Sequence, residues 1–226
     1  MVLIVPRLLS TSQVAEFRQA LGAAEWVDGK ATAGYLSSRT KNNMQVPEGH
    51  PVARRLGNVI LDELDKNPLF ISAALPAKVV PPLFNRYTDG QSYGGHIDGA
   101  VRPIAGTPHR VRSDLSATVF LADPAEYDGG ELVIGGAGEE RRVKLPPGDM
   151  VLYAGGTVHH VAPMTRGVRL AAFFWVQSMV RDERRRAILF DLDNALQRLG
   201  RTSADHDACV ALAGVYHNLL RDWAEI

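Results

Sequence analysis

The region from residue 76 to residue 177 limits the fold most, because short apolar stretches alternate there with groups of turn-forming residues. Each apolar stretch has the length of about one strand, and the stretches lie at 77–87, 114–123, 130–136, 149–155, 158–163 and 167–177. The turn-forming groups are Asp89-Gly90, Gly129-Gly130, Gly135-Gly136, Pro146-Pro147-Gly148-Asp149 and Gly155-Gly156. No helical pattern separates these stretches, so they predict an antiparallel sandwich or jelly roll.

Two helical patterns precede this β region. In residues 10–24, Ser10 and Gln13 have the spacing of a capping box. Residues 51–65 begin with a proline, which suits the first turn of a helix. Apolar residues recur at helical spacing in both, at Val14, Phe17 and Leu21 and at Leu56, Ile60 and Leu64. We therefore expect N-terminal helices within about residues 10–66.

A further helical region follows residue 177. Residues 181–200 predict one helix, which Gly200 can end, and residues 203–226 predict a second, capped by Ser203 or Asp205. The apolar face of the first helix consists of Ile188, Leu189, Leu192, Ala195, Leu196 and Leu199. Together the two helices form an αα-hairpin.

The chain is thus expected to consist of a domain at residues 1–177, with a jelly-roll core at about 76–177, and a C-terminal helical extension at 178–226. The hairpin cannot bury its apolar face alone. We expect it to dock on the β core or on a second subunit, which would make the protein a homo-oligomer.

Composition excludes several partners. Lys+Arg and Asp+Glu are 25 each, which gives no electrostatic reason to expect nucleic acid or an anionic membrane as partner. Cys209 is the only cysteine, so an intrachain disulfide and a cysteine-based zinc site are excluded. No run of 18 apolar residues occurs, and the N-terminal apolar stretch is too short for a signal peptide. We expect a soluble, cytoplasmic protein.

His96 and Asp98 are the first candidate metal ligands. They lie in "NRYTDGQSYGGHIDGAV", residues 85–101, a segment rich in glycine, tyrosine and small polar residues. In an extended segment, residues two apart point to the same side, so an imidazole and a carboxylate can reach one metal ion. A single His-x-Asp pair is also common in surface loops near turns, so the pair is weak evidence by itself.

His159 and Arg169 strengthen this interpretation. A histidine is unusual in "TVHHV", and an arginine in the apolar stretch "GVRLAAFF" needs an anionic partner that the strand itself does not offer. A bound dicarboxylate would serve, because guanidinium grips carboxylate with two parallel hydrogen bonds. His160 competes with His159, but counting by twos back from Arg169 favours His159. The other histidines, His50, His109, His206 and His217, are interpreted as surface residues.

Two histidines and one carboxylate form the facial triad of non-haem Fe(II) oxygenases. With the triad and the arginine at this spacing, the chain resembles Fe(II)/2-oxoglutarate-dependent dioxygenases, and more narrowly the PKHD-type hydroxylases of the prolyl-4-hydroxylase-like group. The resemblance also rests on "RSDLSATVFLADPAEYDGGELVI", on "LPPGDMVLYAGGTVHHVAPMTRGVRLAAFFWVQSMVRD" and on the helical tail, and it covers essentially the whole chain. It implies a mainly β fold with flanking helices, built on a double-stranded β-helix (a jelly-roll or cupin-like core).

The resemblance also implies roles for single residues. His96, Asp98 and His159 would bind Fe(II), and Arg169 would bind the C5 carboxylate of 2-oxoglutarate. Tyr87 matches a family tyrosine that helps to hold this co-substrate, although a tyrosine at a strand end is more often a packing residue. Phe120 falls where some relatives have a second tyrosine hydroxyl, which phenylalanine lacks. O2 would be the other co-substrate, and L-ascorbate the reductant that restores the iron.

The family name implies hydroxylation of a prolyl or lysyl side chain in a peptide or protein, with release of succinate and CO2. Neither composition nor spacing indicates this substrate, so a small-molecule substrate stays open beside a peptide or protein. Residues 99–113 form either a lid over it or a solvated loop. Two other classes stay open: a cupin-like metalloenzyme without 2-oxoglutarate, which would not need Arg169, and a non-enzymatic metal-binding module.

Overall fold

The computed structural model describes residues 1–32, 34–35, 37–136, 138, 140–202 and 205–225. Its largest sheet has eight strands, and all their pairings are antiparallel. The order along the sheet is β1 (Val2–Val5), β14 (Met150–Ala154), β10 (Leu115–Phe120), β17 (Arg169–Ser178), β6 (Leu83–Tyr87), β4 (Met44–Gln45) and β2 (Val27–Asp28), while β5 (Pro76–Val79) also pairs with β17.

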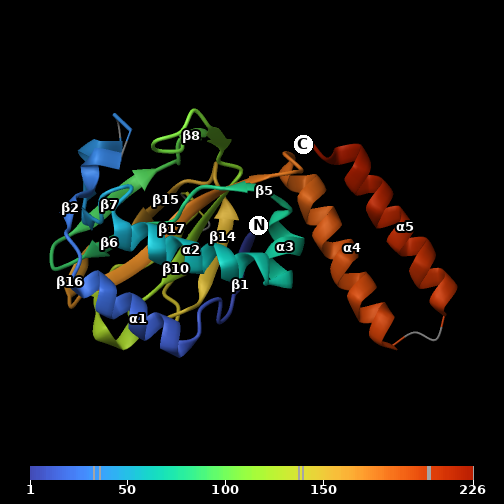
Figure 1. The fold of residues 1–226 in the computed structure, drawn as a ribbon, viewed down its shortest axis with the longest axis horizontal. Helices are drawn as coiled ribbons and strands as arrows, with labels where there is room; N and C mark the ends of the chain where they lie inside the picture. The colour runs from blue at the N-terminus through green and yellow to red at the C-terminus, as the bar shows by residue number, and fades with distance from the viewer. Residues whose placement is uncertain (33, 36, 137, 139, 203–204, 226) are drawn as a thin grey trace.

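A second antiparallel sheet has five strands, in the order β13 (Arg141–Val143), β12 (Leu132–Ile134), β15 (His159–Val161), β7 (Ser92–His96) and β3 (Lys41–Asn42). Two further pairs are small: β11 (Asp128–Gly129) with β16 (Met164–Arg166), and β8 (Val101–Pro103) with β9 (Arg110–Arg112). This antiparallel core with flanking helices, visible in Figure 1, confirms the expected mainly β, jelly-roll fold.

Three helices cover the larger sheet: α1 (Thr11–Gly22), α2 (Pro51–Asp65) and α3 (Pro68–Ala74). The capping box of Ser10 and Gln13 is present at the start of α1. The sequence patterns did not predict α3, which has only seven residues. It starts at this point because Asn67 caps it and Pro68 occupies its first turn.

Successive side chains of β17 point to opposite faces of the sheet, toward the hydrophobic core or toward the pocket described below. Ala172, Phe174 and Val176 point toward the helices and belong to the main hydrophobic cluster. Arg169 and Phe173 point to the other face of the sheet and line the pocket. One face of β17 therefore packs against the helices, and its other face contributes side chains to the site.

The structure corrects the expected strand at 77–87, which is divided into β5 and β6. Pro81 and Pro82 lie at the break, where prolines cannot donate hydrogen bonds to a neighbouring strand. The sequence patterns also missed β1, which pairs with β14 and extends the larger sheet.

Two long helices end the chain, α4 (Glu183–Thr202) and α5 (His206–Trp223). The expected end of α4 at Gly200 is wrong, since the helix continues to Thr202. Asp205 caps α5 through its side chain, while the alternative cap, Ser203, lies outside the described residues. The base of the hairpin packs on the rest of the protein, and its far end projects away from it (Figure 1). Within the described ranges, no helix is long and apolar enough to cross a membrane.

Candidate active site

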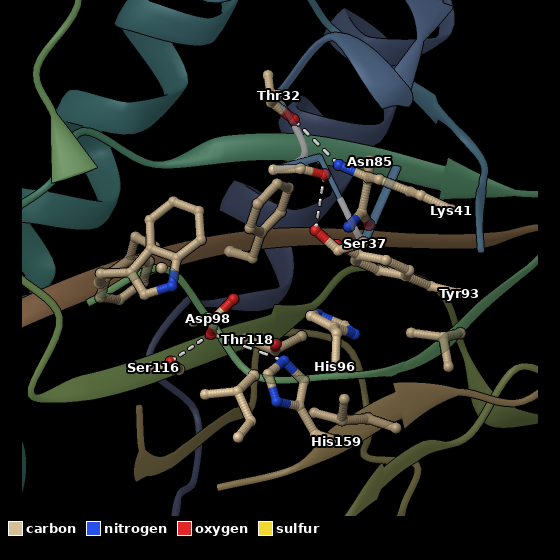
Figure 2. Close-up of a pocket in the computed structure, with 18 of the residues that line it drawn as sticks. Thr32, Ser37, Lys41, Asn85, Tyr93, His96, Asp98, Ser116, Thr118 and His159 are labelled. Carbon is tan, nitrogen blue, oxygen red and sulfur yellow. Dashed lines mark hydrogen bonds and ion pairs between the residues drawn. The ribbon is translucent and has the colours of Figure 1, made fainter. Parts of the chain in front are cut away.

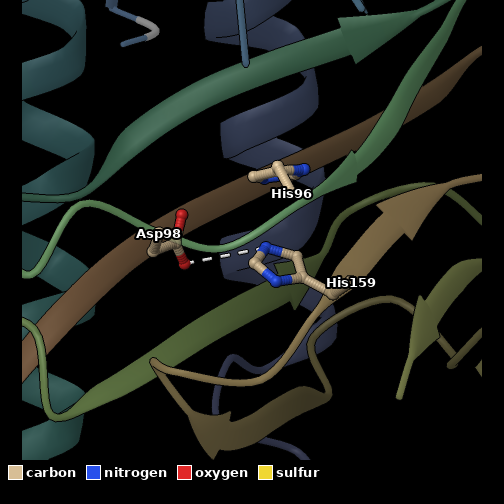
Figure 3. A group of neighbouring side chains, drawn as sticks. All are labelled: His96, Asp98 and His159. Atoms are coloured by element: carbon tan, nitrogen blue, oxygen red, sulfur yellow. Dashed lines mark ion pairs between the residues drawn. The ribbon is translucent and has the colours of Figure 1, made fainter. Parts of the chain in front are cut away.

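His96, Asp98 and His159 lie together between the two sheets (Figure 3). The antiparallel pairing of β7 with β15 makes His96 the direct cross-strand neighbour of His159, and Asp98 follows two residues after the end of β7. One ligand atom from each side chain lies within 4.8 Å of the other two. Strand pairing thus brings together residues that are more than sixty positions apart in the sequence.

Backbone carbonyl groups orient both imidazole rings. The Nδ1 atom of His96 lies 2.9 Å from the Gly94 carbonyl oxygen, and that of His159 lies 3.0 Å from the Thr157 carbonyl oxygen. Because a carbonyl oxygen only accepts, each Nδ1 donates, and the lone pair of each neutral ring is on Nε2. Metal-binding histidines commonly have such a partner on the other ring nitrogen.

Asp98 is held by Ser116 of β10, whose hydroxyl donates to the Oδ2 atom at 2.6 Å. The same oxygen lies 3.6 Å from Nε2 of His159. The sequence reasoning did not identify Ser116. The available signal was the alternation of polar Ser116 and Thr118 in an otherwise apolar strand, which places both on one face.

Burial keeps His96 neutral at pH 7. Removal from water lowers its pKa to about 4, and the neighbouring His159 adds to this effect. The Tyr93 ring covers one face of His96, with the ring centres 3.7 Å apart. A neutral imidazole is the form that binds metal ions.

Arg169 is the most deeply buried charged side chain of the pocket, with 2% of its surface exposed. Its Nε and Nη1 atoms are buried and have no hydrogen-bond partner in the part of the chain that the structure describes. Its guanidinium lies 5.3 Å from the Tyr87 ring centre and 5.4 Å from that of Phe120. Phe120 therefore contributes an aromatic face to the arginine in place of a hydroxyl.

Tyr87, the fifth candidate from the sequence, is the cross-strand neighbour of Arg169. It lines the same pocket and is almost fully buried. Burial raises the pKa of its hydroxyl to about 12, although the nearby Arg169 opposes the shift, so the phenol stays protonated.

Tyr153 of β14 is a pocket residue that the sequence reasoning missed. Burial and the carboxylate of Asp98 raise its pKa, whereas Arg169 and the neighbouring Thr118 hydroxyl lower it. The charges of both Asp98 and Arg169 thus act on the Tyr153 hydroxyl. A tyrosine in the middle of the apolar stretch "MVLYA" was the available signal, because a buried phenol needs a polar partner.

The structure places His159, and not His160, in the metal-ligand group. His160 is the next residue of β15 and points to its other face. His109, His206 and His217 are exposed, as expected of surface residues. His50 is half-buried and caps α2, since its Nδ1 accepts from the backbone of Val52.

The candidate residues line one cavity of about 930 Å³ (Figure 2). The segment 99–113 is not a free loop, and its role as a lid over the substrate remains a prediction. Its two strands, β8 and β9, form a hairpin, and Val101, Arg102 and Pro103 of β8 line one side of the cavity.

Similarity to known proteins agrees with this geometry. Residues 82–177 match the 2OG-Fe(II) oxygenase superfamily, and residues 182–225 match the PKHD-type hydroxylase C-terminal domain. A PKHD-type hydroxylase of Pseudomonas putida strain W619 is 54% identical over all 226 residues of both chains. The chain belongs to the PKHD-type hydroxylase family. Another member, PiuC of Pseudomonas aeruginosa strain PAO1, is 53% identical over the same full length.

Solved structures with low sequence identity share the fold of this PKHD-type hydroxylase. A 2OG-Fe(II) family oxidoreductase from Burkholderia pseudomallei has a TM-score of 0.55 at 14% identity, covering 78% of this chain and 85% of its own. A prolyl-4-hydroxylase from Pseudomonas putida has a TM-score of 0.51 at 20% identity, covering 78% and 92%.

As a PKHD-type hydroxylase, the protein is a 2-oxoglutarate-dependent dioxygenase that uses Fe(II), 2-oxoglutarate and O2. The residues present fit these groups. The three clustered side chains offer two imidazole nitrogens and one carboxylate, which is the ligand set of the non-haem iron oxygenases. The unpartnered guanidinium atoms of Arg169 fit a carboxylate. Family membership decides against both a cupin-like enzyme without 2-oxoglutarate and a non-enzymatic module.

Proposed function

We propose that this protein hydroxylates an unactivated C–H bond of a prolyl or lysyl side chain in a peptide or protein, with release of succinate and CO2. One observation carries the proposal: a His-Asp-His group and a buried, unpartnered arginine line the same cavity. The family name and the prolyl hydroxylases among the proteins of similar fold support the choice of substrate.

In this proposal, Nε2 of His96, Nε2 of His159 and a carboxylate oxygen of Asp98 bind the iron. Ser116 keeps the carboxylate in position through its hydrogen bond, and the two backbone carbonyls keep both rings from rotating. Bound iron supplies the oxidising chemistry, together with 2-oxoglutarate and O2, and this chain supplies the geometry around it.

Arg169 would bind the C5 carboxylate of 2-oxoglutarate with two parallel hydrogen bonds. The rings of Tyr87 and Phe120 both lie near the guanidinium, and burial excludes water from it. Tyr153 lines the same cavity, and its hydroxyl would donate to the co-substrate in place of the hydroxyl that Phe120 lacks. We also propose L-ascorbate as the reductant that restores Fe(II) after turnover without substrate.

Succinate release tests this function. The protein is incubated with 2-oxoglutarate and Fe(II), with Zn(II) in place of Fe(II), or with a chelator, each with and without prolyl- and lysyl-containing peptides. We expect slow release with Fe(II) alone, and faster release with a peptide that gains the mass of one oxygen atom. Equal turnover under the three metal conditions would contradict the proposed chemistry, and acceleration without peptide oxidation would contradict the substrate.

A further inference from the structure

Lys41, the first residue of β3, is a buried cation inside the cavity. Only 4% of its surface is exposed. Its Nζ atom donates to Thr32 Oγ1 at 3.0 Å and to Gln45 Oε1 at 3.2 Å, and both acceptors are neutral. Because an ammonium group has three N–H donors, one is left without a protein acceptor among the described residues.

Aromatic rings surround this cation and a second one. The Nζ atom of Lys41 lies 5.4 Å from the Tyr93 ring centre and 5.8 Å from that of Phe173. The guanidinium of Arg102, on β8, lies 3.9 Å from the Trp175 ring centre. Aromatic faces stabilise cations by their quadrupoles but carry no net charge, so both positive charges stay uncompensated.

No carboxylate of the described chain lies within ion-pair distance of Lys41 or Arg102. Asp98, Asp28 and Glu48 affect the charge of Lys41 only from further away, and Arg102 opposes them. Asp98 is a proposed iron ligand, so its negative charge would compensate the metal ion and not Lys41. A buried ammonium without a counterion is costly, and it is therefore explained best by an anion that binds there.

Lys41 lies across the cavity from Asp98 and His159, as Figure 2 shows. It is also separate from the position of Arg169. Phe173, which contacts Lys41, is four residues from Arg169 along β17, so their Cα atoms are about 13 Å apart. Lys41 and Arg169 thus lie near different parts of strand β17 and of the cavity.

We propose that Lys41, supported by Arg102, binds an acidic group of the prime substrate, a carboxylate or a phosphate, and so directs a nearby C–H bond toward the iron ligands. The rings of Tyr93, Phe173 and Trp175 contact the apolar part of the substrate next to this group. The inference rests on the proposed function, since that function places iron on the opposite side of the cavity.

Small aromatic probes test the inference, because they share a phenyl ring that matches the aromatic lining and carry either an anionic or a neutral polar group. Dissociation constants of benzoate, phenyl phosphate and benzamide are measured by ligand-observed NMR on protein loaded with Zn(II) and saturating 2-oxoglutarate, which keeps Arg169 occupied. We expect at least one anion to bind about tenfold or more tightly than neutral benzamide. The anion with the lower dissociation constant, benzoate or phenyl phosphate, shows whether the site prefers a carboxylate or a phosphate.

Two variants and one control complete the experiment. Lys41→Met should remove the preference for the anion, Arg102→Leu should weaken it, and Lys78→Met, at an exposed position of β5, should leave it unchanged. Benzamide binding as tightly as both anions overturns the inference. So does a preference that persists in both variants, or a Lys41→Met protein that loses affinity for 2-oxoglutarate together with the anion.

Succinate release by the wild type separates the two proposals. If the anion preference depends on Lys41 but no Fe(II)-dependent release occurs, the proposed function fails and the anion site stands. If release occurs and the preference is absent, only the anion site is wrong.

Discussion

Two buried residues of the cavity, Arg169 and Lys41, carry a positive charge without a protein counterion among the described residues. The sequence indicated the first, because an arginine in a continuous apolar stretch is conspicuous. It did not indicate the second, because Lys41 follows a polar, turn-rich segment in which a lysine is ordinary. Only the pairing of β3 with β7 brings Lys41 beside Tyr93 and into the pocket.

Lys41→Met should stabilise the protein at pH 7. Burial lowers the pKa of Lys41 from 10.5 to about 8, with Arg102 adding to the shift and Asp98, Asp28 and Glu48 opposing it. The folded pKa lies below the unfolded one, so the folded state is penalised by an amount on the order of 3 kcal/mol below pH 8. This penalty disappears as the pH rises from about 8 to 10.5.

Denaturant unfolding of the wild type and of Lys41→Met across this pH range measures the effect. The variant should be more stable at pH 7, and its advantage should shrink as the pH approaches 10.5. Lys78→Met, exposed on β5, is the matched control. An advantage that does not change with pH would show that burial of charge is not its cause.

Arg169→Leu should weaken the binding of 2-oxoglutarate while leaving metal binding intact. A hydrogen bond to a charged group contributes roughly 1.5–3 kcal/mol, so the loss of one such contact predicts about ten- to a hundredfold lower affinity. Calorimetry in the presence of Mn(II), with the melting temperature of the same sample, measures both effects. Wild-type affinity in a folded variant would refute the assignment of the co-substrate site.

At the scale of elements, the pattern of short strands was sufficient to predict the jelly roll, and the capping signals were sufficient for α1 and α2. The sequence patterns did not predict the break between β5 and β6 or the helix α3. Pro81 and Pro82 interrupt a stretch that reads as one strand, and α3 is too short to show a helical period. In the site, the order His-x-Asp, His, Arg was visible in the sequence. Ser116 and Tyr153 left only a weak signal there, and the pairing of β10 with β14 places them side by side.

The helix α4 has an apolar face of which only part is covered. Leu189 is fully buried against the neighbouring segments, while Ile188 and Leu199 of the expected face are 45% and 38% exposed. Contact of α4 with α3 at the base of the hairpin covers Leu189, and the far end of the hairpin, where Leu199 lies, extends beyond the β core (Figure 1). Ile188, next to Leu189 in the sequence, lies on a more exposed side of the same helical turn.

Leu189→Ala should therefore lower the free energy of unfolding by about 2–5 kcal/mol, since it leaves a cavity in a packed cluster. Leu199→Ala, the same change near the exposed end of the helix, should change it by about 0.5 kcal/mol or less. Urea unfolding followed by circular dichroism gives both values. Equal effects of the two substitutions would contradict this description of the hairpin.

At the scale of the whole molecule, several polar contacts link the C-terminal helices to the rest of the chain. The N-terminal amino group, at the start of β1, lies 2.6 Å from the Glu183 carboxylate of α4. Arg112 of β9 binds Asp114 with two hydrogen bonds and lies 3.2 Å from Glu225, just after α5. The division into residues 1–177 and 178–226, made from the sequence, remains a prediction.

The homo-oligomer expected from the sequence also remains a prediction. Val210 and Val215 of α5 are 56% and 48% exposed, and a second subunit would cover them. We expect light scattering to give more than the mass of one chain, and a Val210→Glu, Val215→Glu variant to approach the mass of a monomer. A monomeric wild type would show that the hairpin docks only on its own chain.

In the proposed active site, His96, Asp98 and His159 bind the iron to which 2-oxoglutarate is bound. An anaerobic titration of the protein with Fe(II) and 2-oxoglutarate tests it most directly, because chelation of ferrous iron by the 2-oxo acid gives a weak visible charge-transfer band. His159→Ala should abolish this band, and His160→Ala, one residue away on the opposite face of β15, should retain it. No band in folded wild-type protein, or the same band in both variants, would contradict the claim.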